Sequence, residues 1–226
     1  VTNIPSYSTD SVAQHVFAFI LNFTNRVSEH SISVNNGDWI KNPDFCYWLN
    51  PLQELNGKTL GIYGFGSIGQ KVAQIAHAFG MKVIISVHNS NSFTGKEKTV
   101  ALDELFSSSD FLTLHAPLTN ETSQVVNKNT LSLMKKTAYI INTARGGLVN
   151  ENDIKYFLEN NLIAGFAADV INEEPMSKTC PLFNVKNCVL TPHIAWAPKE
   201  TRQRLLGILH ENLKSFLSGK PVNVVN

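Results

Sequence analysis

The sequence predicts an α/β protein built on a doubly wound parallel sheet, and three features of the chain support this fold class. Six short apolar runs recur along the chain, most of them rich in β-branched residues. Segments with helical periodicity separate most of these runs. The first run leads into a glycine-rich turn, Gly64-Phe65-Gly66-Ser67-Ile68-Gly69. Because strands that alternate with helices are joined by right-handed crossovers, we expect them to lie parallel in one sheet.

The predicted strands occupy residues 59–63, 82–87, 111–115, 138–142, 164–169 and 188–191. Helices are predicted between them at residues 102–106, 128–134 and 151–159, the last with Asn150 as its N-cap. A further amphipathic helix follows the sheet from Lys199 to about Leu217, and Gly219 and Pro221 end it. Six parallel strands are the number found in a complete dinucleotide-binding (Rossmann) fold.

The glycine turn carries the first functional signal. Gly64 permits a sharp turn, Gly66 lets the backbone approach a pyrophosphate, and Gly69 lets the following helix pack close to the strand. That helix has one apolar face and ends at Gly80, which is suited to the C′ position. A G-x-G-x-x-G pattern alone is weak evidence. Between a strand and a helix, however, it predicts that phosphate groups bind at the helix N-terminus.

The N-terminal segment is predicted to begin with a helix that Thr9 or Asp10 caps and that runs to about Phe23. Its apolar residues occupy nearly every face, so we expect burial between domains or between subunits, the alternative being a central helix of a single core. Residues 26–51 are rich in Ser, Asn and Gly with scattered aromatic residues, which indicates an arm that lies on another surface. The helix and the arm together predict a two-fold homodimer.

Composition excludes several other classes of function. The formal net charge of +1 gives no electrostatic reason to expect a nucleic-acid or membrane partner. Cys46, Cys180 and Cys188 have no C-x-x-C spacing, so neither a disulfide framework nor a metal site is indicated, and a cytoplasmic protein is expected. The longest apolar patch, residues 12–23, is too short to span a bilayer.

Polar side chains follow the last three predicted strands, where sheets of this kind bind ligands. Arg145 offers a planar fork suited to a carboxylate, and His193 exchanges protons near neutral pH. Glu174 is placed to orient His193 and to raise its pKa by favouring the imidazolium. The alternatives are that Arg145 only caps carbonyl groups, that Glu174 is a solvated loop residue and that His193 is a satisfied surface histidine.

Three motifs resemble the signatures of the D-isomer-specific 2-hydroxyacid dehydrogenases. They are Asn142-Thr143-Ala144-Arg145-Gly146-Gly147-Leu148-Val149, Asp169-Val170 with Glu174-Pro175, and Thr191-Pro192-His193-Ile194. Within that family, Phe45-Cys46-Tyr47-Trp48 and Ala195-Trp196-Ala197-Pro198-Lys199-Glu200 are similar to the glycerate dehydrogenase (hydroxypyruvate reductase) branch. The resemblance covers almost the whole chain, from Tyr7 to Asn223.

The resemblance implies hydride transfer between a nicotinamide cofactor and a small 2-oxo or 2-hydroxy acid, most closely hydroxypyruvate and D-glycerate. It implies that Arg145 binds the substrate, that His193 protonates the carbonyl oxygen, that Glu174 holds His193, and that Trp196 contacts the substrate. The implied cofactor contacts, besides Arg145 and His193, are Gly64, Phe65, Gly66, Ser67, Ile68, Gly69, His88, His115, Ala116, Pro117, Thr122, Thr143, Ala144, Asp169 and Ala195. Asp169 is expected to hydrogen-bond the nicotinamide amide. No metal is implied.

One departure from the usual pattern concerns the choice of cofactor. Residues 86–90 contain no carboxylate, although an acidic residue after the second strand commonly binds the ribose 2′-hydroxyl of NAD and repels NADP. NAD is the expected cofactor and NADP is not excluded, since His88, Asn89 and Ser90 are suited to a phosphate. The alternative is a neutral loop, with NAD held through its pyrophosphate and ring.

The resemblance also implies a two-domain organisation. Residues 10–196 would form the cofactor domain, with an interdomain and dimer segment at 10–51. Residues 1–9 and 197–226 would be remnants of a flavodoxin-like substrate domain, whose first part of about 100 residues is expected to be absent. We therefore expect this chain to bind a dinucleotide but to reduce hydroxypyruvate poorly or not at all. A competing hypothesis is a catalytically silent nucleotide sensor, which would tolerate loss of Arg145 or His193.

Overall fold

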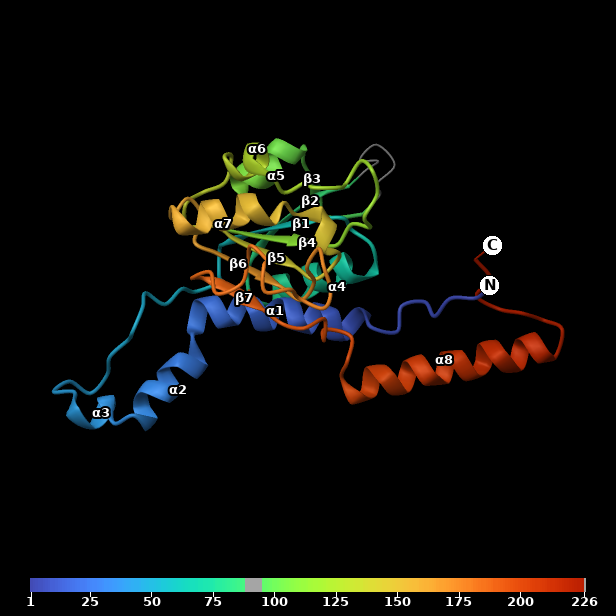
Figure 1. The fold of residues 1–226 in the computed structure, drawn as a ribbon, viewed down its shortest axis with the longest axis horizontal. Coiled ribbons are helices and arrows are strands. Elements are labelled where there is room, and N and C mark those ends of the chain that lie inside the picture. Colours follow the sequence, from blue (N-terminus) through green and yellow to red (C-terminus); the bar gives the residue numbers. More distant parts are fainter. Residues whose placement is uncertain (88–94, 226) are drawn as a thin grey trace.

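A parallel sheet of seven strands forms the centre of the protein (Figure 1). The computed structural model describes residues 1–87 and 95–225, so His88 lies outside the described residues. The strands are β1 (Thr59–Tyr63), β2 (Lys82–Ser86), β3 (Lys98–Thr99), β4 (Phe111–Leu114), β5 (Tyr139–Asn142), β6 (Gly165–Ala168) and β7 (Cys188–Leu190). All six predicted strands are confirmed, with ends that differ by at most one residue, whereas the short edge strand β3 was not predicted.

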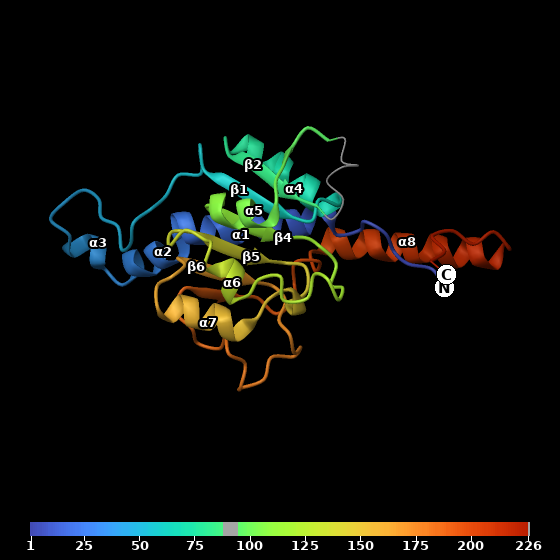
Figure 2. The same cartoon turned by 90° about the horizontal axis from the view of Figure 1, so that it is seen from above.

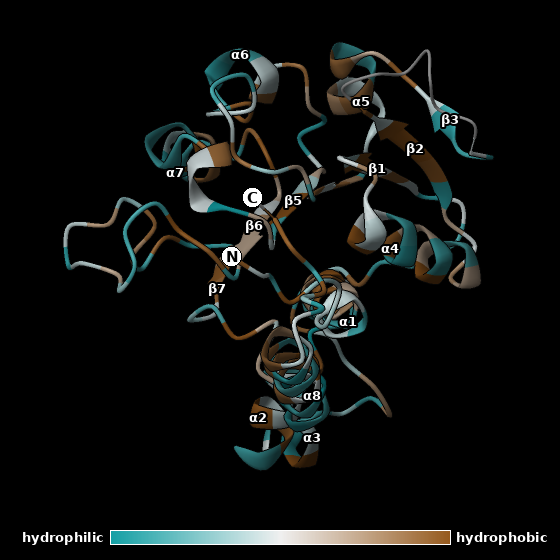
Figure 3. Ribbon diagram, turned by 90° about the vertical axis from the view of Figure 1, so that its right-hand side faces the viewer, coloured by the Kyte–Doolittle hydropathy of each residue, from teal (hydrophilic) through white to brown (hydrophobic). Residues whose placement is uncertain are grey.

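The strand order is β3-β2-β1-β4-β5-β6-β7, and every pair is parallel. The order therefore reverses between β1 and β4, which makes the carboxyl ends of these two strands the topological switch point of the sheet. All residues of β4, β5 and β6 are buried, as expected where helices cover both faces. β2 is brown over most of its length in Figure 3, as its apolar run predicts, and teal at its first end.

Helices cover the two faces of the sheet and define two core clusters (Figures 1 and 2). α5 (Leu102–Ser108), α6 (Lys128–Leu131) and α7 (Glu151–Glu159) lie on one face, and α1 (Thr9–Asn25) and α4 (Ser67–Ala78) lie on the other. The α7 prediction is confirmed together with its cap, because the Asn150 side chain accepts the Asp153 N–H at 3.2 Å. α6 ends three residues earlier than predicted.

The helix α1 corrects two expectations. Its N-cap is Ser8, which makes no side-chain cap, so neither Thr9 nor Asp10 caps it. Its apolar residues pack into the core of this chain's own domain against α4 and β5, and its exposed residues are Asp10, Gln14, Ala18, Asn22 and Asn25. Within the chain, the arrangement is therefore the alternative one, a central helix of a single core.

The arm, residues 26–51, leaves the body of the protein (Figures 1 and 2). It contains two short helices that were not predicted, α2 (Val27–Asn35) and α3 (Asp38–Lys41). At the other end of the molecule, α8 (Lys199–Leu217) has the predicted bounds and extends away from the sheet beside the N-terminal segment. None of the helices in the described part of the chain combines the length and the hydropathy that a bilayer span requires.

Candidate functional site

The turn between β1 and α4 has the conformation that its glycines predict. Gly64 has a φ of +88°, and a Cβ added there would lie 2.5 Å from the backbone nitrogen of Ala116. A Cβ on Gly69 would lie 2.6 Å from the carbonyl oxygen of Gly64, so this glycine lets α4 pack onto the turn. Gly66 differs from both, because a Cβ there would meet no atom within 4 Å. Gly66 therefore borders open space rather than protein.

The N-terminus of α4 is suited to an anion. Gly66 occupies the N-cap position and provides no side-chain cap for the first turn, which begins at Ser67 and Ile68. The N–H groups of a first helical turn have no partner within the helix, and together they carry a partial positive charge. The open space beside Gly66 and these N–H groups form a cradle suited to a phosphate, and among the described residues the N-cap residue supplies no side-chain acceptor to it.

A cavity of about 580 Å³ adjoins this cradle at the switch point of the sheet. Its lining residues come from the ends of β1 and β2 and from the segment after β4: Tyr63, Gly64, Phe65, Ser86, Val87, Leu102, Ala116, Pro117, Thr119, Glu121 and Thr122. Thr122 also shapes its own loop, since its hydroxyl donates to the Pro117 carbonyl at 2.6 Å. Sequence reasoning identified Phe65, Ala116, Pro117 and Thr122 but missed Tyr63 and Glu121.

The Glu121 carboxylate gives this cavity a negative charge. Burial raises the pKa of the Tyr63 hydroxyl, and the nearby charge of Glu121 raises it further. Glu121 thus lies in the same cavity as Ser86 and Val87, at the end of β2. No pattern in the sequence indicated this, because residues 86–87 and 121 come together only in the folded protein.

Two buried polar atoms at the strand ends have no hydrogen-bond partner among the described residues. They are Nε2 of His115, directly after β4, and Oγ1 of Thr143, directly after β5. Burial lowers the pKa of His115 to about 3, so its imidazole is neutral at physiological pH. Buried polar groups are normally satisfied, and two orphans at the edge where parallel sheets bind ligands indicate that a polar ligand completes them.

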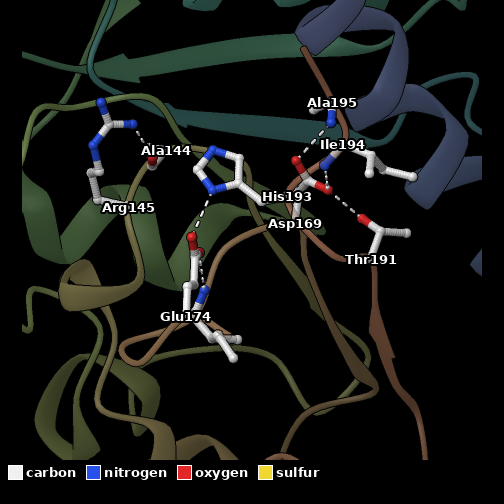
Figure 4. A network of polar contacts seen from close by, with 9 residues as sticks. Ala144, Arg145, Asp169, Glu174, Thr191, His193, Ile194 and Ala195 are labelled. Carbon is white, nitrogen blue, oxygen red and sulfur yellow. Dashed lines mark hydrogen bonds and ion pairs between the residues drawn. The ribbon is translucent and has the colours of Figure 1, made fainter. Parts of the chain in front are cut away.

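Arg145 is held at the end of β5 by a turn that the buried Asn142 organises. The Asn142 side chain donates to the Arg145 carbonyl at 2.9 Å and accepts the Ala144 N–H at 3.0 Å. The Arg145 guanidinium is exposed and donates to the Ala144 carbonyl at 2.6 Å (Figure 4). This is the carbonyl-capping alternative, although a guanidinium has five N–H donors and most remain for a ligand.

His193 and Glu174 form the pair that the sequence predicted. Nδ1 of His193 lies 2.7 Å from Oε2 of Glu174, while the other carboxylate oxygen accepts the Ile171 N–H at 3.1 Å (Figure 4). Partial burial acts to raise the pKa of Glu174. The hydrogen bonds from His193 and Ile171 and the charges of His193 and Arg145 outweigh this effect, so that the pKa is lowered. Glu174 is therefore ionised near neutral pH and leaves Nε2 of His193 to face a ligand.

Asp169, at the end of β6, is only 2% exposed and is occupied by the loop that carries His193. It accepts the Ile194 and Ala195 N–H groups, each at 2.8 Å, and the Thr191 hydroxyl at 2.5 Å (Figure 4). Two of these donors bond to Oδ1 and one to Oδ2, so an acceptor site remains on Oδ2, and the contact with the nicotinamide amide expected from the resemblance stays a prediction. In the structure Asp169 is first of all an anchor of the histidine loop.

A second cavity of about 580 Å³ borders the histidine pair. Asp169, Ile171, Glu174, Pro175, Met176, Leu190, Thr191, Pro192 and His193 line it. Arg145 and Trp196 are described by the structure but do not line this cavity. Trp196 is half-buried, three residues after His193 in the sequence. The structure thus brings together Arg145, Glu174 and His193 at one edge of the sheet but does not place Trp196 in the same cavity.

Comparison with known proteins agrees with this geometry. The family model for the D-isomer specific 2-hydroxyacid dehydrogenase, NAD binding domain, matches residues 17–195. The hydroxypyruvate reductase of Blautia hydrogenotrophica is 46% identical over 228 residues, a match that covers 100% of this chain and 71% of the relative. The glycerate dehydrogenase of Methylorubrum extorquens is 37% identical over 227 residues, with 100% and 71% covered.

A similar fold is present in the NADPH-dependent glyoxylate/hydroxypyruvate reductase of Sinorhizobium meliloti, solved in complex with NADP and malonate. It superposes with a TM-score of 0.88 at 29% identity, and the match covers 100% of this chain and 70% of the solved one. The family model and the solved structure thus agree on the family and the fold of this chain.

Proposed function

Because this chain belongs to the D-isomer-specific 2-hydroxyacid dehydrogenase family, we propose that its polar cluster interconverts hydroxypyruvate and D-glycerate. The chain is an NAD(P)-dependent oxidoreductase of 2-hydroxy acids. The observation that carries the proposal is the His193–Glu174 pair at 2.7 Å, which lies at the same sheet edge as Arg145.

The described residues fit a nicotinamide dinucleotide. Gly66 borders open space at an uncapped helix N-terminus, which suits a pyrophosphate, and the orphaned atoms of His115 and Thr143 are available to polar groups farther along the sheet edge. We propose that these residues, with Ser67, Ile68 and the other cofactor contacts inferred from the sequence, hold the cofactor. When bound, the cofactor supplies or accepts the hydride.

The protein's own groups bind and protonate the oxo acid. Arg145 presents a fixed positive fork to the substrate carboxylate and the neighbouring carbonyl oxygen. As negative charge develops on that oxygen during reduction, the His193 imidazolium stabilises it and transfers a proton from Nε2. Glu174 fixes the ring orientation through Nδ1 and stabilises the imidazolium form, as the 2.7 Å hydrogen bond supports.

We propose NAD rather than NADP as the preferred cofactor, on the charge of the cavity beside the glycine turn. Among the described lining residues, Glu121 is acidic and none is a lysine or arginine. A ribose 2′-phosphate entering this cavity would meet a like charge. Titration of the chain with NADH and NADPH tests this. Glu121→Gln is the variant, and Glu104→Gln, at an exposed position of α5, is the charge-matched control. We expect the preference for NADH over NADPH, as the ratio of the two affinities, to become smaller in Glu121→Gln and to stay unchanged in Glu104→Gln.

We also propose that the chain forms a two-fold homodimer through its arm. The arm carries several exposed apolar side chains, among them Val27, Ile32, Trp39, Ile40 and Phe45. Exposed apolar surface on a segment that leaves the body of the protein is typical of an interface. Sedimentation at micromolar concentration should show a dimer. Ile40→Glu, at a side chain 89% exposed in the single chain, should give a monomer of unchanged thermal stability.

Residues 10–196 are proposed as the cofactor domain, with residues 1–9 and 197–226 as a separate unit. Within that unit, the Asn212 side chain donates to the Asn3 carbonyl at 2.8 Å, and Arg204 donates to the Tyr7 carbonyl at 3.1 Å. A cytoplasmic location is likewise proposed, since the structure has Cys46, Cys180 and Cys188 as free thiols.

The deciding experiment measures hydroxypyruvate-dependent oxidation of NADH by the chain, with NADH affinity determined separately by fluorescence. His193→Ala should lower kcat about 10²–10⁴-fold, the usual contribution of a general acid, and change the NADH affinity little. Arg145→Ala should mainly raise the KM for hydroxypyruvate. Turnover that survives His193→Ala would contradict the proposed chemistry, whereas loss of NADH binding would instead implicate the fold.

A further inference from the structure

A row of side-chain hydrogen bonds, called the His15–Thr191–Asp169 chain below, leads from Asp169 to the helix α1. The Thr191 hydroxyl donates to Oδ1 of Asp169 at 2.5 Å, and Nε2 of His15, on α1, lies 3.0 Å from the same hydroxyl oxygen. His15 and Thr191 are 176 residues apart in the sequence. The chain therefore joins α1 to the loop after β7 through side chains alone.

The directions of these hydrogen bonds follow from the donors available. A hydroxyl has one proton, and a carboxylate only accepts, so the Thr191 proton points to Asp169. The oxygen of Thr191 must then accept from Nε2–H of His15. Burial lowers the pKa of His15 despite the opposing charge of Asp169, so the ring is neutral at physiological pH and carries one proton. His15 thus acts as a fixed donor at the outer end of the chain.

At the Asp169 end, these hydrogen bonds lie next to a strained backbone at His193. His193 has a φ of +55°, in the left-handed region that residues other than glycine rarely adopt. Its own N–H donates to the Thr191 carbonyl at 3.0 Å, and the next two N–H groups donate to Asp169. The conformation that aims His193 at Glu174 therefore depends on Thr191 and Asp169 together.

We propose that His15 and Thr191 are positioning residues that act through Asp169 to hold His193 in its left-handed conformation. The inference rests on the proposed role of His193 as the proton donor. It explains why a histidine lies among Val12, Val16 and Phe19 on the packed side of a largely apolar helix. The competing interpretation is a polar pair that only satisfies itself in the core.

Hydrogen exchange measured by NMR separates the two interpretations without requiring turnover. The readout is the protection of the Ile194 and Ala195 amides, compared with the Ile140 amide in the centre of the sheet. Thr191→Val removes the hydroxyl and keeps the shape of the side chain, while Thr191→Ser keeps the hydroxyl. His15→Leu removes the donor, while His15→Gln keeps an amide donor of similar reach.

We expect Thr191→Val and His15→Leu each to lower protection of the Ile194 and Ala195 amides about 10-fold, the equivalent of one ordinary hydrogen bond, and to leave Ile140 unchanged. Thr191→Ser and His15→Gln should keep most of the protection of these two amides. The double variant should lower amide protection little more than either single variant, because both substitutions break the same row of hydrogen bonds. Equal loss at all three amides, or no loss at any, would overturn the proposal.

Kinetics on the same variants provides the second readout. Thr191→Val and His15→Leu should lower kcat about 10- to 100-fold with little change in NADH affinity, since small misplacement of a catalytic group has effects of that size. Loosened amides with an unchanged kcat would also overturn the proposal. If the wild-type chain itself showed no measurable turnover, the kinetic comparison could not be made, and the exchange data alone would decide whether His15 and Thr191 hold the backbone at residues 193–195.

Discussion

Gly64 and Gly66 are separated by one residue, yet alanine should have opposite effects on stability at the two positions. Gly64 has a φ of +88°, and a Cβ there would meet the Ala116 backbone at 2.5 Å. Gly66 has a φ of −75° and a ψ of −165°, which is extended backbone that alanine adopts, and nothing lies within 4 Å of its Cβ position. Only the first glycine is thus required by the fold of the chain itself.

The magnitudes follow from these contacts. Gly66→Ala reduces the freedom of the unfolded chain without strain, which should stabilise the protein by about 0.4–1 kcal/mol. For a chain of this length that corresponds to a rise in Tm of about 1–4 °C. Gly64→Ala adds left-handed strain and a clash with backbone, and should cost about 2 kcal/mol or more, which lowers Tm by at least about 4 °C.

Cofactor binding should respond in the opposite sense at Gly66. The open space beside it is where we place the pyrophosphate, so a methyl group there should weaken NADH binding at least about 10-fold while Tm rises. Calorimetry without cofactor and fluorescence titration with NADH measure the two quantities separately. If Gly66→Ala bound NADH as tightly as the wild type, or destabilised the free protein as much as Gly64→Ala, the assignment of this cradle would be refuted.

Three further predictions concern the histidine pair and the framework of the site. Glu174→Gln should move the alkaline limb of the pH profile of hydroxypyruvate reduction to lower pH, because a neutral amide no longer favours the His193 imidazolium; an unchanged profile would refute the pairing as a functional one. Asp110→Asn should lower the free energy of unfolding by about 1–2 kcal/mol at pH 7 in urea titrations, because Asp110 accepts hydrogen bonds from Lys135 and from the Thr59 N–H, both at 2.8 Å. These hydrogen bonds and the lysine charges outweigh the effect of burial and lower the pKa of Asp110. The stabilisation is therefore present above the ordinary carboxyl pKa and is lost as the pH falls through the lowered pKa. A stability difference between wild type and Asp110→Asn that persisted in strong acid would argue against this origin. Gly146→Ala should destabilise the chain by about 2 kcal/mol or more, since its Cβ would overlap the backbone of Ile171 and separate the loops that carry Arg145 and Glu174; a variant as stable as the wild type would show that these loops are not tightly packed.

Much of the fold could be predicted because its signals are local. Fully buried parallel strands require continuous apolar runs, so six of the seven strands could be predicted from the sequence. Only the two-residue edge strand β3 was too short to show a pattern. Asn150 and Gly80 marked helix ends because caps depend on residues a few positions apart. In the turn at Gly80, the N–H groups of Gly80 and Met81 donate to the carbonyls of His77 and Ala76, as a C′ glycine requires.

The approach of Arg145, Glu174 and His193 was also determined by the sequence. The carboxyl ends of parallel strands lie at one edge of a sheet, so residues that directly follow β5, β6 and β7 meet once the strand order is known. The sequence did not determine that the Arg145 guanidinium donates to its neighbouring carbonyl, because that depends on a rotamer rather than on a position.

Only the tertiary structure decided which partners the remaining polar residues have. The apolar pattern of α1 required burial but did not say whether the covering surface belonged to this chain, and the sheet and α4 supply it. No pattern in the sequence singled out His15, which the fold sets against Thr191, or showed that the Asp169 oxygens accept the Ile194 and Ala195 N–H groups. Periodicity and turn chemistry act over a few residues, whereas these contacts depend on how a helix is rotated against a sheet, and that is fixed by packing across the whole chain.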